Sequence, residues 1–494
     1  MRRSDAQDLT FQQARETFGA AQKGETFGTA EHQDRLSLTD LGNCYRFVNY
    51  FGRDFRYCPA LGWVVYNGTR WEFDELGAVM RTAKLTARLL YEEAGMTQDD
   101  DLRKAIGKHA RASEAERKLT AMVTLARTEP TIAVRAQELD ADPMLLNCPN
   151  GIVDLTTGEL ASHRREALMT KVAGVSYDPQ MKCARWRLFL KEIFVGQTDL
   201  INYMQRALGY ALTGVVRERV FFILHGGGAN GKSTLVETMH AVLGDYGCNT
   251  RPETFLAKKY DAIPVDVASL RGARFVFANE LNQGRKIDEG LIKSLTGRDT
   301  VTARLLRQNP FSFKPTFKIF LETNHLPTIA GTDNAIWSRV HPVPFDGTIA
   351  ETDQDPNLPA KLLAEGPGIL AWLVEGCLAW QRDGLGEPPR VRMAREDYRE
   401  REDQVGSFLD DQAVLSPDEE VTTKDLYEAY QDWAKSSGEK KVLSKRAFGL
   451  AMKDRKFADY RTHKGRGWRG VRLRRHDEVF AEPGEPKEAG VLAD

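Results

Sequence analysis

The segment from Gly226 to Thr234 reads Gly-Gly-Gly-Ala-Asn-Gly-Lys-Ser-Thr, and its residue types suit the binding of phosphate groups. Glycines let backbone N–H groups curl around phosphate oxygens, and a helix that begins directly after the loop adds a favourable dipole. Lys232 is placed to reach the β- and γ-phosphates, and the Ser233 hydroxyl is placed to ligate Mg²⁺. The segment therefore predicts binding of ATP with Mg²⁺. The predicted ATP-binding residues are Gly226, Gly227, Gly228, Ala229, Asn230, Gly231, Lys232, Ser233 and Thr234.

The segments on both sides of this loop predict the elements that would position it. Residues 220–225 form an apolar run of strand length, and residues 235–243 have helical spacing that stops at Gly244. A strand, a glycine loop and a helix in this order distinguish a phosphate-binding loop from an accidental glycine turn.

Polar residues follow two further predicted strands. Residues 274–278 lead to Asn279 and Glu280, and residues 317–323 lead to Asn324. A carboxylate at the end of a strand beside the phosphate loop can polarise an attacking water, so Glu280 is the candidate base. An amide next to it, that of Asn324, can hold the γ-phosphate or the water.

A single arginine, Arg339, follows the turn that begins at Asp333. An arginine supplied by a neighbouring subunit would stabilise charge on a transferring phosphoryl group. In isolation, an arginine at such a place is more often a surface ion-pair residue.

Length and composition limit the class of protein. The chain has 494 residues, is 41% hydrophobic and carries a formal net charge of −1. This length predicts roughly three domains, and the near-zero charge means that any nucleic-acid site must be a local patch. No apolar run approaches the ~20 residues of a membrane span, so we expect a cytoplasmic protein with no membrane partner. Scattered cysteines predict buried or half-buried thiols rather than a zinc site or disulfides.

Shifts in composition along the chain predict five segments. In the second segment, Asn67-Gly68 supplies the turn between two aromatic strands, which predicts a hairpin. The segments are a mobile N-terminal arm (1–37), a helical and β-hairpin N-terminal domain (38–180), an ATPase domain with flanking helices (181–400), a basic domain (405–475) and a disordered tail (476–494).

The basic segment has the pattern of a winged helix-turn-helix. Thr422 or Thr423 and then Ser444 are predicted caps of two helices, and residues 466–473 predict the hairpin of the wing. Such a domain would seat one helix in the major groove of duplex DNA. The alternative is a solvated basic face on a small interaction domain. The candidate DNA contacts here are Lys445, Arg446 and Arg469.

The elements around the phosphate loop resemble, in order and spacing, superfamily 3 helicases, and more closely the phage, plasmid and poxvirus helicase-primase family. The matching stretches are residues 226–234, 270–280, 295–304, 323–327 and 331–340, and the resemblance covers roughly residues 38–399. It implies an AAA+ type α/β core with a parallel sheet, assembled as a hexamer with ATP between subunits. It also implies that Arg339 acts in trans, that Asn324 is the sensor, and that single-stranded DNA threads the ring in the 3′ to 5′ direction.

Alternation around a polar turn at residues 301–314 predicts a further hairpin. In the resembled family this hairpin projects into the ring channel and grips the DNA backbone. Arg307 at its tip is the first candidate, with Arg304 and Lys314 in support. Contacts of this kind bring affinity and salt dependence without sequence preference. An ordinary solvated turn is the alternative.

The sequence departs from the family pattern at two places. Many relatives carry an acidic residue where this chain has Asn279, so Mg²⁺ would rely on Ser233, waters and Glu280, and the role of Glu280 as metal ligand or base stays open. Many relatives also carry a primase domain ahead of the helicase, whereas 37 residues precede the first structured segment here. We therefore expect a chain that unwinds DNA and does not prime, with a separate primase and polymerase as partners.

Two functions remain open. The first is a ring-shaped replicative helicase of a phage, plasmid or other mobile element. The second is an AAA+ initiator that binds an origin through its C-terminal domain and remodels DNA without processive travel. The complete set of Lys232, Ser233, Glu280, Asn324 and Arg339 argues against a scaffold with an inactive nucleotide site.

Overall fold

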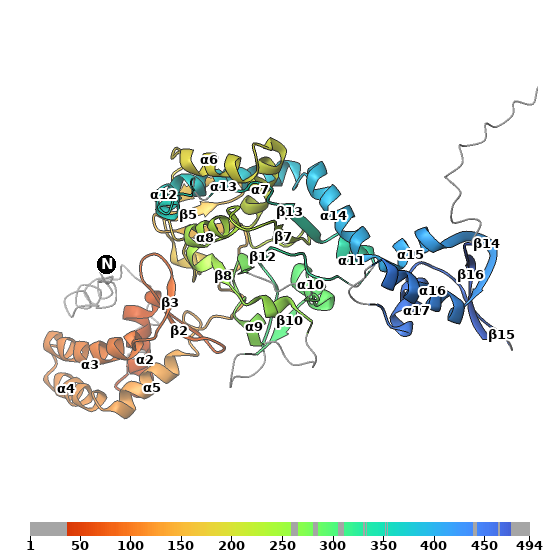
Figure 1. Ribbon diagram of the computed structural model, residues 1–494. Helices are drawn as coiled ribbons and strands as arrows, with labels where there is room; N and C mark the ends of the chain where they lie inside the picture. The colour runs from red at the N-terminus through yellow and green to blue at the C-terminus, as the bar shows by residue number, and fades with distance from the viewer. Residues whose placement is uncertain are drawn as a thin grey trace, which may run out of the picture.

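The computed structural model describes residues 37–257, 265–279, 285–304, 311–329, 331, 333–350, 352, 354–437, 442–462 and 465–475. Three groups of elements follow one another along the chain (Figure 1). Helices with a small sheet come first, a parallel sheet between helices forms the centre, and a smaller helical and antiparallel group ends the described chain.

The N-terminal group contains the predicted hairpin. Strand β2 pairs with β3 in antiparallel fashion, and the Asn67 side chain accepts hydrogen bonds from the N–H groups of Thr69 and Arg70, both at 2.9 Å. Gly68 takes a φ of +97° in the turn, a conformation that favours glycine. The elements are α2 (Asp40–Phe51), β1 (Phe55–Cys58), β2 (Gly62–Tyr66), β3 (Trp71–Phe73), α3 (Ala78–Met96), α4 (Asp100–Ser113) and α5 (Glu116–Ala126).

A second antiparallel sheet connects this group to the centre. It consists of β4 (Leu145–Cys148), β5 (Gly151–Asp154) and β6 (Glu159–Ala161). A turn through Thr157 and Gly158 joins β5 to β6. Helices α6 (Ala184–Ile193) and α7 (Thr198–Tyr210) follow.

The central sheet has five parallel strands in the order β13-β7-β12-β9-β8. The predicted α/β class with a parallel sheet is confirmed at this level. Strand β13 contains two prolines, and its place at the edge of the sheet accommodates them because an edge strand needs fewer backbone donors. The strands are β7 (Phe221–His225), β8 (Gly247–Asn249), β9 (Phe275–Asn279), β12 (Lys318–Thr323) and β13 (Val340–Pro344).

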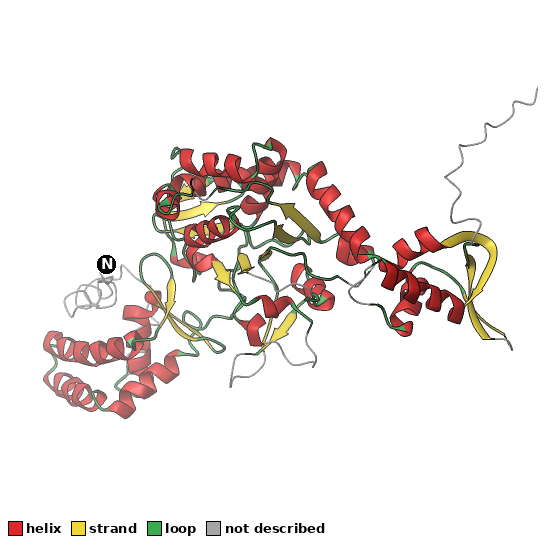
Figure 2. Cartoon of the chain, viewed as in Figure 1, coloured by secondary structure: helices red, strands yellow, loops and turns green. Residues whose placement is uncertain are grey.

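Both faces of this sheet are covered, as Figure 2 shows for the helices above it. Phe222 and Leu224 of β7 belong to one apolar core with α6 and α7, whereas Phe221 and Ile223 belong to a second core on the other face. A strand covered on both sides reads as a continuous apolar run. The remaining central elements are α8 (Lys232–Leu243), α9 (Val265–Ala268), α10 (Glu289–Thr296), β10 (Val301–Ala303), β11 (Phe311–Phe313), α11 (Asn334–Trp337), α12 (Leu358–Ala364), α13 (Gly366–Asp383) and α14 (Pro389–Glu402).

Helices α7 and α13 approach each other closely through two glycines. A Cβ atom on Gly209 would lie 2.3 Å from the backbone nitrogen of Cys377, and one on Gly376 would lie 2.2 Å from the Gln205 carbonyl oxygen. Five of the six cysteines are buried and all six are free, as predicted. In the part of the chain that the structure describes, no single helix has the length and apolar composition to cross a membrane, and only the bent pair α12–α13 passes that test together.

The C-terminal group has the order helix, strand, helix, helix, strand, strand. Both predicted caps are confirmed, because Thr422 accepts a hydrogen bond from the Asp425 N–H (3.1 Å) and Ser444 accepts one from the Ala447 N–H (3.3 Å). The elements are α15 (Gln404–Gln412), β14 (Ala413–Thr422), α16 (Thr423–Ser436), α17 (Lys445–Asp454), β15 (Asp459–Thr462) and β16 (Gly465–Leu473).

The prediction of a complete hairpin within residues 466–473 is wrong. These residues form a single strand, β16, which pairs with β14 on one side and with β15 on the other. Gly470 has a φ of +86°, yet it lies where the pairing of β14 with β16 shifts register rather than at a turn. A glycine inside a strand can mark such an irregularity as readily as a turn.

Candidate nucleotide-binding site

The phosphate-loop segment joins the end of β7 to the start of α8, as predicted. Ala229 and Gly231 both have positive φ values, +54° and +82°. Strained backbone of this kind at a non-glycine residue concentrates at functional sites. The segment that follows β13 holds the loop in place. Asn230 Nδ2 donates to the Phe345 carbonyl (3.2 Å), and the Ile349 N–H donates to the Ala229 carbonyl (2.9 Å).

Lys232 lies inside the loop with only 4% of its surface exposed. Its Nζ donates to the carbonyls of Gly226 and Gly227, both at 3.0 Å, and to Asn230 Oδ1 at 2.8 Å. A fourth acceptor is Asn324 Oδ1 at 3.2 Å. Burial lowers the pKa of the Lys232 ammonium, and the nearby carboxylate of Glu322 opposes this shift. The structure thus brings together two predicted site residues, Lys232 and Asn324, from two neighbouring strands.

Ser233, the predicted metal-ligating serine, donates its hydroxyl hydrogen bond to Glu322 Oε1 at 2.5 Å. Glu322 is 5% exposed and lies on β12 directly beside Asn279 of β9. Asn279 Oδ1 is buried and has no hydrogen-bond partner among the described atoms. Hydroxyl, amide and carboxylate oxygens are the ligands that Mg²⁺ prefers, usually together with the phosphates of a nucleotide. These residues therefore fit a nucleotide with Mg²⁺.

The sequence interpretation missed Glu322. The available signal was a carboxylate near the end of the mostly apolar predicted strand 317–323. Its contact with Ser233 depends on the order of the strands, which periodicity does not determine. The predicted base, Glu280, follows Asn279 in the sequence and lies outside the described residues.

Arg339 lies at the opposite end of the sheet from the phosphate loop. Its carbonyl accepts a hydrogen bond from the Phe221 N–H at 2.7 Å, so it is level with the first residue of β7. Strand β7 rises about 3.3 Å per residue, so its length separates Arg339, beside Phe221, from Gly226 by roughly 16 Å. Its guanidinium donates to the Ala335 carbonyl, and burial together with the neighbouring Arg219 lowers its pKa. The structure does not bring Arg339 to the Lys232 of its own chain.

The predicted hairpin at 301–314 is confirmed as far as its two strands are described. Val301 pairs with Phe313 and Ala303 pairs with Phe311 in antiparallel register. Arg304 and Lys314, the residues that flank the strands, are both exposed. The predicted tip residue, Arg307, lies outside the described residues.

The basic candidates of the C-terminal group differ in their surroundings. Lys445 and Arg446 are exposed at the first two positions of α17. Arg469 forms an ion pair with Glu420 at 2.9 Å, so part of its charge is offset locally.

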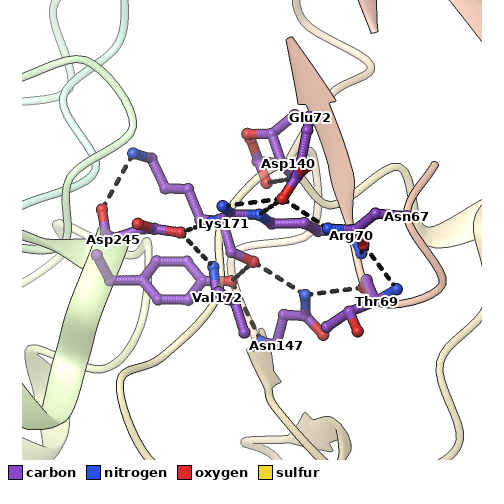
Figure 3. Close-up of polar contacts among 11 residues, drawn as sticks. Asn67, Thr69, Arg70, Glu72, Asp140, Asn147, Lys171, Val172 and Asp245 are labelled. Atoms are coloured by element: carbon purple, nitrogen blue, oxygen red, sulfur yellow. Dashed lines mark hydrogen bonds and ion pairs between the residues drawn. The ribbon is translucent and has the colours of Figure 1, made fainter. Parts of the chain in front are cut away.

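The N-terminal group contacts the end of the helix that carries Lys232 and Ser233 (Figure 3). Arg70, just after the turn between β2 and β3, forms an ion pair with Asp245 in the turn that follows α8. The same carboxylate accepts a hydrogen bond from the Val172 N–H at 3.0 Å. Asn147 Nδ2 donates to the carbonyls of Thr69 (3.1 Å) and Lys171 (2.9 Å). The sequence interpretation did not predict this junction.

The fold and the site define a parallel α/β protein whose loop lysine and serine contact polar residues at the carboxyl end of the neighbouring strand β12. Comparison with known families adds two matches. The family described as D5 N terminal like matches residues 44–195, and a family of unknown function, DUF5906, matches residues 224–339.

Relatives occur in large DNA viruses. A protein named "Putative helicase" from Acanthamoeba polyphaga mimivirus is 28% identical over 328 residues, which are 61% of this chain and 34% of that protein. A protein of the same name from Frog virus 3 is 30% identical over 240 residues, 44% of this chain and 25% of that protein. A "Putative primase" of African swine fever virus is 22% identical over 383 residues, 71% of this chain and 39% of that protein.

These matches support a D5-like helicase-primase family protein and so bear out the predicted resemblance. The chain spans between 25% and 39% of the length of these viral relatives. Among solved structures, the C-terminal region of NrS-1 in an apo form has a TM-score of 0.47 at 10% identity, covering 84% of this chain and 94% of that one.

Proposed function

We propose that the protein is an ATP-dependent DNA helicase that serves the replication of a virus, phage, plasmid or other mobile element. The observation that carries the proposal is the meeting of Lys232 Nζ with Asn324 Oδ1 at 3.2 Å. A lysine from the phosphate loop and an amide from the adjacent strand would then address the same phosphate, as nucleotide hydrolysis requires. The names of the viral relatives support the link to DNA unwinding.

The proposed assembly is a ring, with six subunits as in the resembled family. It is supported by the position of Arg339, which lies level with the start of β7 whereas the phosphate loop follows its end. An arginine in that position can serve a nucleotide held by the next subunit but not the one held by its own loop. Each ATP would therefore be hydrolysed between two subunits, with Arg339 stabilising the charge of the transferred group.

Two regions are proposed to contact DNA. The hairpin β10–β11, with Arg304 and Lys314 exposed beside it, would hold a single strand during 3′ to 5′ movement. In the C-terminal group, the order helix, strand, helix, helix, strand, strand supports the proposal of a winged helix-turn-helix, in which α17 would enter a major groove. Its exposed residues Lys445 and Arg446 would contact the duplex there.

A second candidate function is an origin-binding initiator that remodels DNA without processive travel. The observation that favours it is the exposed basic start of α17 in a compact C-terminal group with a core of its own, which includes Phe408, Trp433 and Phe448. Such a unit can dock on duplex DNA independently of the motor.

Strand separation tests the proposal and distinguishes the two functions. Duplexes with either a 3′ or a 5′ single-stranded tail are incubated with ATP, and Lys232→Ala is the control for nucleotide use. Unwinding that requires a 3′ tail and is lost in the control supports the helicase. ATP hydrolysis without unwinding on either tail would refute the helicase and favour the initiator.

A further inference from the structure

We infer that Glu322 is a residue that positions the metal ion of the nucleotide, in place of the acid that many relatives carry at the position of Asn279, the last residue of β9. The inference rests on the proposed function, because it assumes that the phosphate loop binds ATP together with Mg²⁺. It assigns to β12 a role that the sequence pattern predicted for β9.

The register of the sheet places Glu322 and Asn279 side by side. The two residues are partners in the parallel pairing of β12 with β9. Paired residues of adjacent strands point to the same face of a sheet. Glu322 points toward the start of α8, because its carboxylate accepts the hydrogen bond of Ser233 Oγ at 2.5 Å. Asn279 therefore points toward the same face of the sheet as Glu322.

The two side chains place oxygen atoms on the face of the sheet that Ser233 contacts through Glu322. Asn279 contributes a buried Oδ1 that accepts no hydrogen bond from the described residues. Glu322 contributes a carboxylate with 5% of the residue exposed. A carboxylate is costly to bury unless a positive charge or donors compensate it. The Ser233 hydroxyl already donates to Glu322. A divalent ion next to the serine would add a positive charge, and a water of that ion could donate to Asn279.

Lys232 offers a competing explanation for the buried carboxylate. The charge of Glu322 acts on the Lys232 ammonium, so Glu322 could serve only to hold the lysine in the nucleotide-free loop. The two explanations differ in one respect: a lysine partner would affect nucleotide binding with or without a divalent ion, whereas a metal-positioning residue would affect only the part that the ion adds.

The experiment uses the full chain and a fluorescent ATP analogue, titrated without a divalent ion and with Mg²⁺. Glu322→Gln is expected to bind the analogue without metal as the parent protein does. The gain in affinity on adding Mg²⁺ is expected to fall by about 10- to 100-fold, the usual effect of removing a residue that orients a metal ligand. Binding of Mn²⁺ in the presence of ADP, followed by electron paramagnetic resonance, should weaken in parallel.

Two further variants test position rather than loss. The double variant Asn279→Asp with Glu322→Asn moves the carboxylate from β12 to the paired position on β9. It is expected to restore most of the gain in nucleotide affinity that Mg²⁺ gives. Asn279→Asp alone leaves Glu322 in place and should tighten Mn²⁺ binding, so the inference stays testable even where Glu322→Gln does not fold. Glu237→Gln, an exposed glutamate on α8, is the matched control and should change nothing.

Unchanged Mg²⁺ and Mn²⁺ binding in Glu322→Gln would overturn the inference, and so would an equal loss of affinity with and without metal. Unchanged Mn²⁺ binding in Asn279→Asp would also overturn it. None of these results affects the proposed function, which fails separately if the parent chain does not bind the analogue or if Lys232→Ala binds and hydrolyses ATP normally.

Discussion

The substitution Gly231→Ala probes the start of α8, where the phosphate loop becomes a helix. Gly231 has a φ of +82°, and a Cβ atom there would lie 2.5 Å from Ile193 Cγ2 and 3.0 Å from Phe189 Cε2. The left-handed backbone costs an L-residue about 1–2 kcal/mol, and an extra methyl group in a packed core costs about 1–3 kcal/mol. We therefore expect Gly231→Ala to lower the free energy of unfolding of the central unit by about 2–5 kcal/mol.

Thermal unfolding measures this effect directly. A domain of this size loses about 2–4 °C of melting temperature per kcal/mol, so the central transition should fall by on the order of 10 °C. ATP binding should weaken as well, because the new methyl group displaces the helix start from α6. Gly228→Ala is the matched control: a Cβ atom there meets nothing within 4 Å, and the residue has no positive φ. Its melting temperature should stay within about 2 °C of the parent value, as for other surface changes.

The comparison of the two alanine variants can refute this reasoning. If both variants melt at the same temperature, the local geometry of Gly231 does not set the cost. If Gly231→Ala melts as the parent protein does, the contact with Ile193 and Phe189 is absent in solution.

Four further outcomes are expected. Arg339→Ala should still bind an ATP analogue but should lose most ATP turnover, measured by phosphate release. An equal loss of binding and turnover would count against the action of Arg339 on a neighbouring subunit. Lys314→Ala should lower the slope of log affinity for single-stranded DNA against log salt by about 0.7, whereas an unchanged slope would remove Lys314 from the DNA contact. Burial lowers the pKa of His341 to about 4 from 6.5, so the unfolded chain takes up a proton first as the pH falls below about 6.5. The free energy of unfolding, measured by urea unfolding, should therefore fall by up to about 1.4 kcal/mol per pH unit until about pH 4. The same pH dependence in His341→Phe would contradict this. Arg70→Ala removes the ion pair with Asp245, in which the Arg70 side chain is 26% and the Asp245 side chain 42% exposed. The variant should lower the free energy of unfolding by less than about 1 kcal/mol and should speed hydrogen exchange at the tip of the β2–β3 hairpin. Unchanged exchange there would show that the ion pair does not hold the junction.

Local patterns predicted the elements whose signals are local. The loop between β7 and α8, the Asn67-Gly68 turn, and the caps at Thr422 and Ser444 each depend on residues within one short segment. Strands β7 and β9 were also predicted, because both faces of the sheet are covered and the strands read as apolar runs of the right length.

Features that depend on distant segments were not predicted. Strand β13 carries Pro342 and Pro344, which argue against a strand unless its edge position is known. The contact of Glu322 with Ser233 exists because β12 lies between β7 and β9, an order that the sequence does not state. Residues 466–473 were predicted to form a hairpin, whereas pairing with both β14 and β15 keeps that segment extended.

Strand β12 connects the proposed nucleotide site to the proposed DNA hairpin. Its carboxyl end carries Glu322 and leads to Asn324, and its first residue, Lys318, follows β11 after a short connection. All six residues of the strand are buried, and Lys318 Nζ donates to the Thr213 carbonyl at 2.5 Å, beyond the end of α7.

Strand β12 is paired on both edges, is buried on both faces and is bound at its first residue through Lys318. Sliding of this strand alone would break all of these contacts at once, so it cannot move without its neighbours. A change at Asn324 when the γ-phosphate leaves would therefore move the central sheet and the root of the hairpin as one body. In the proposed ring, the moving boundary would then be the one between subunits, where Arg339 meets the nucleotide of the next chain.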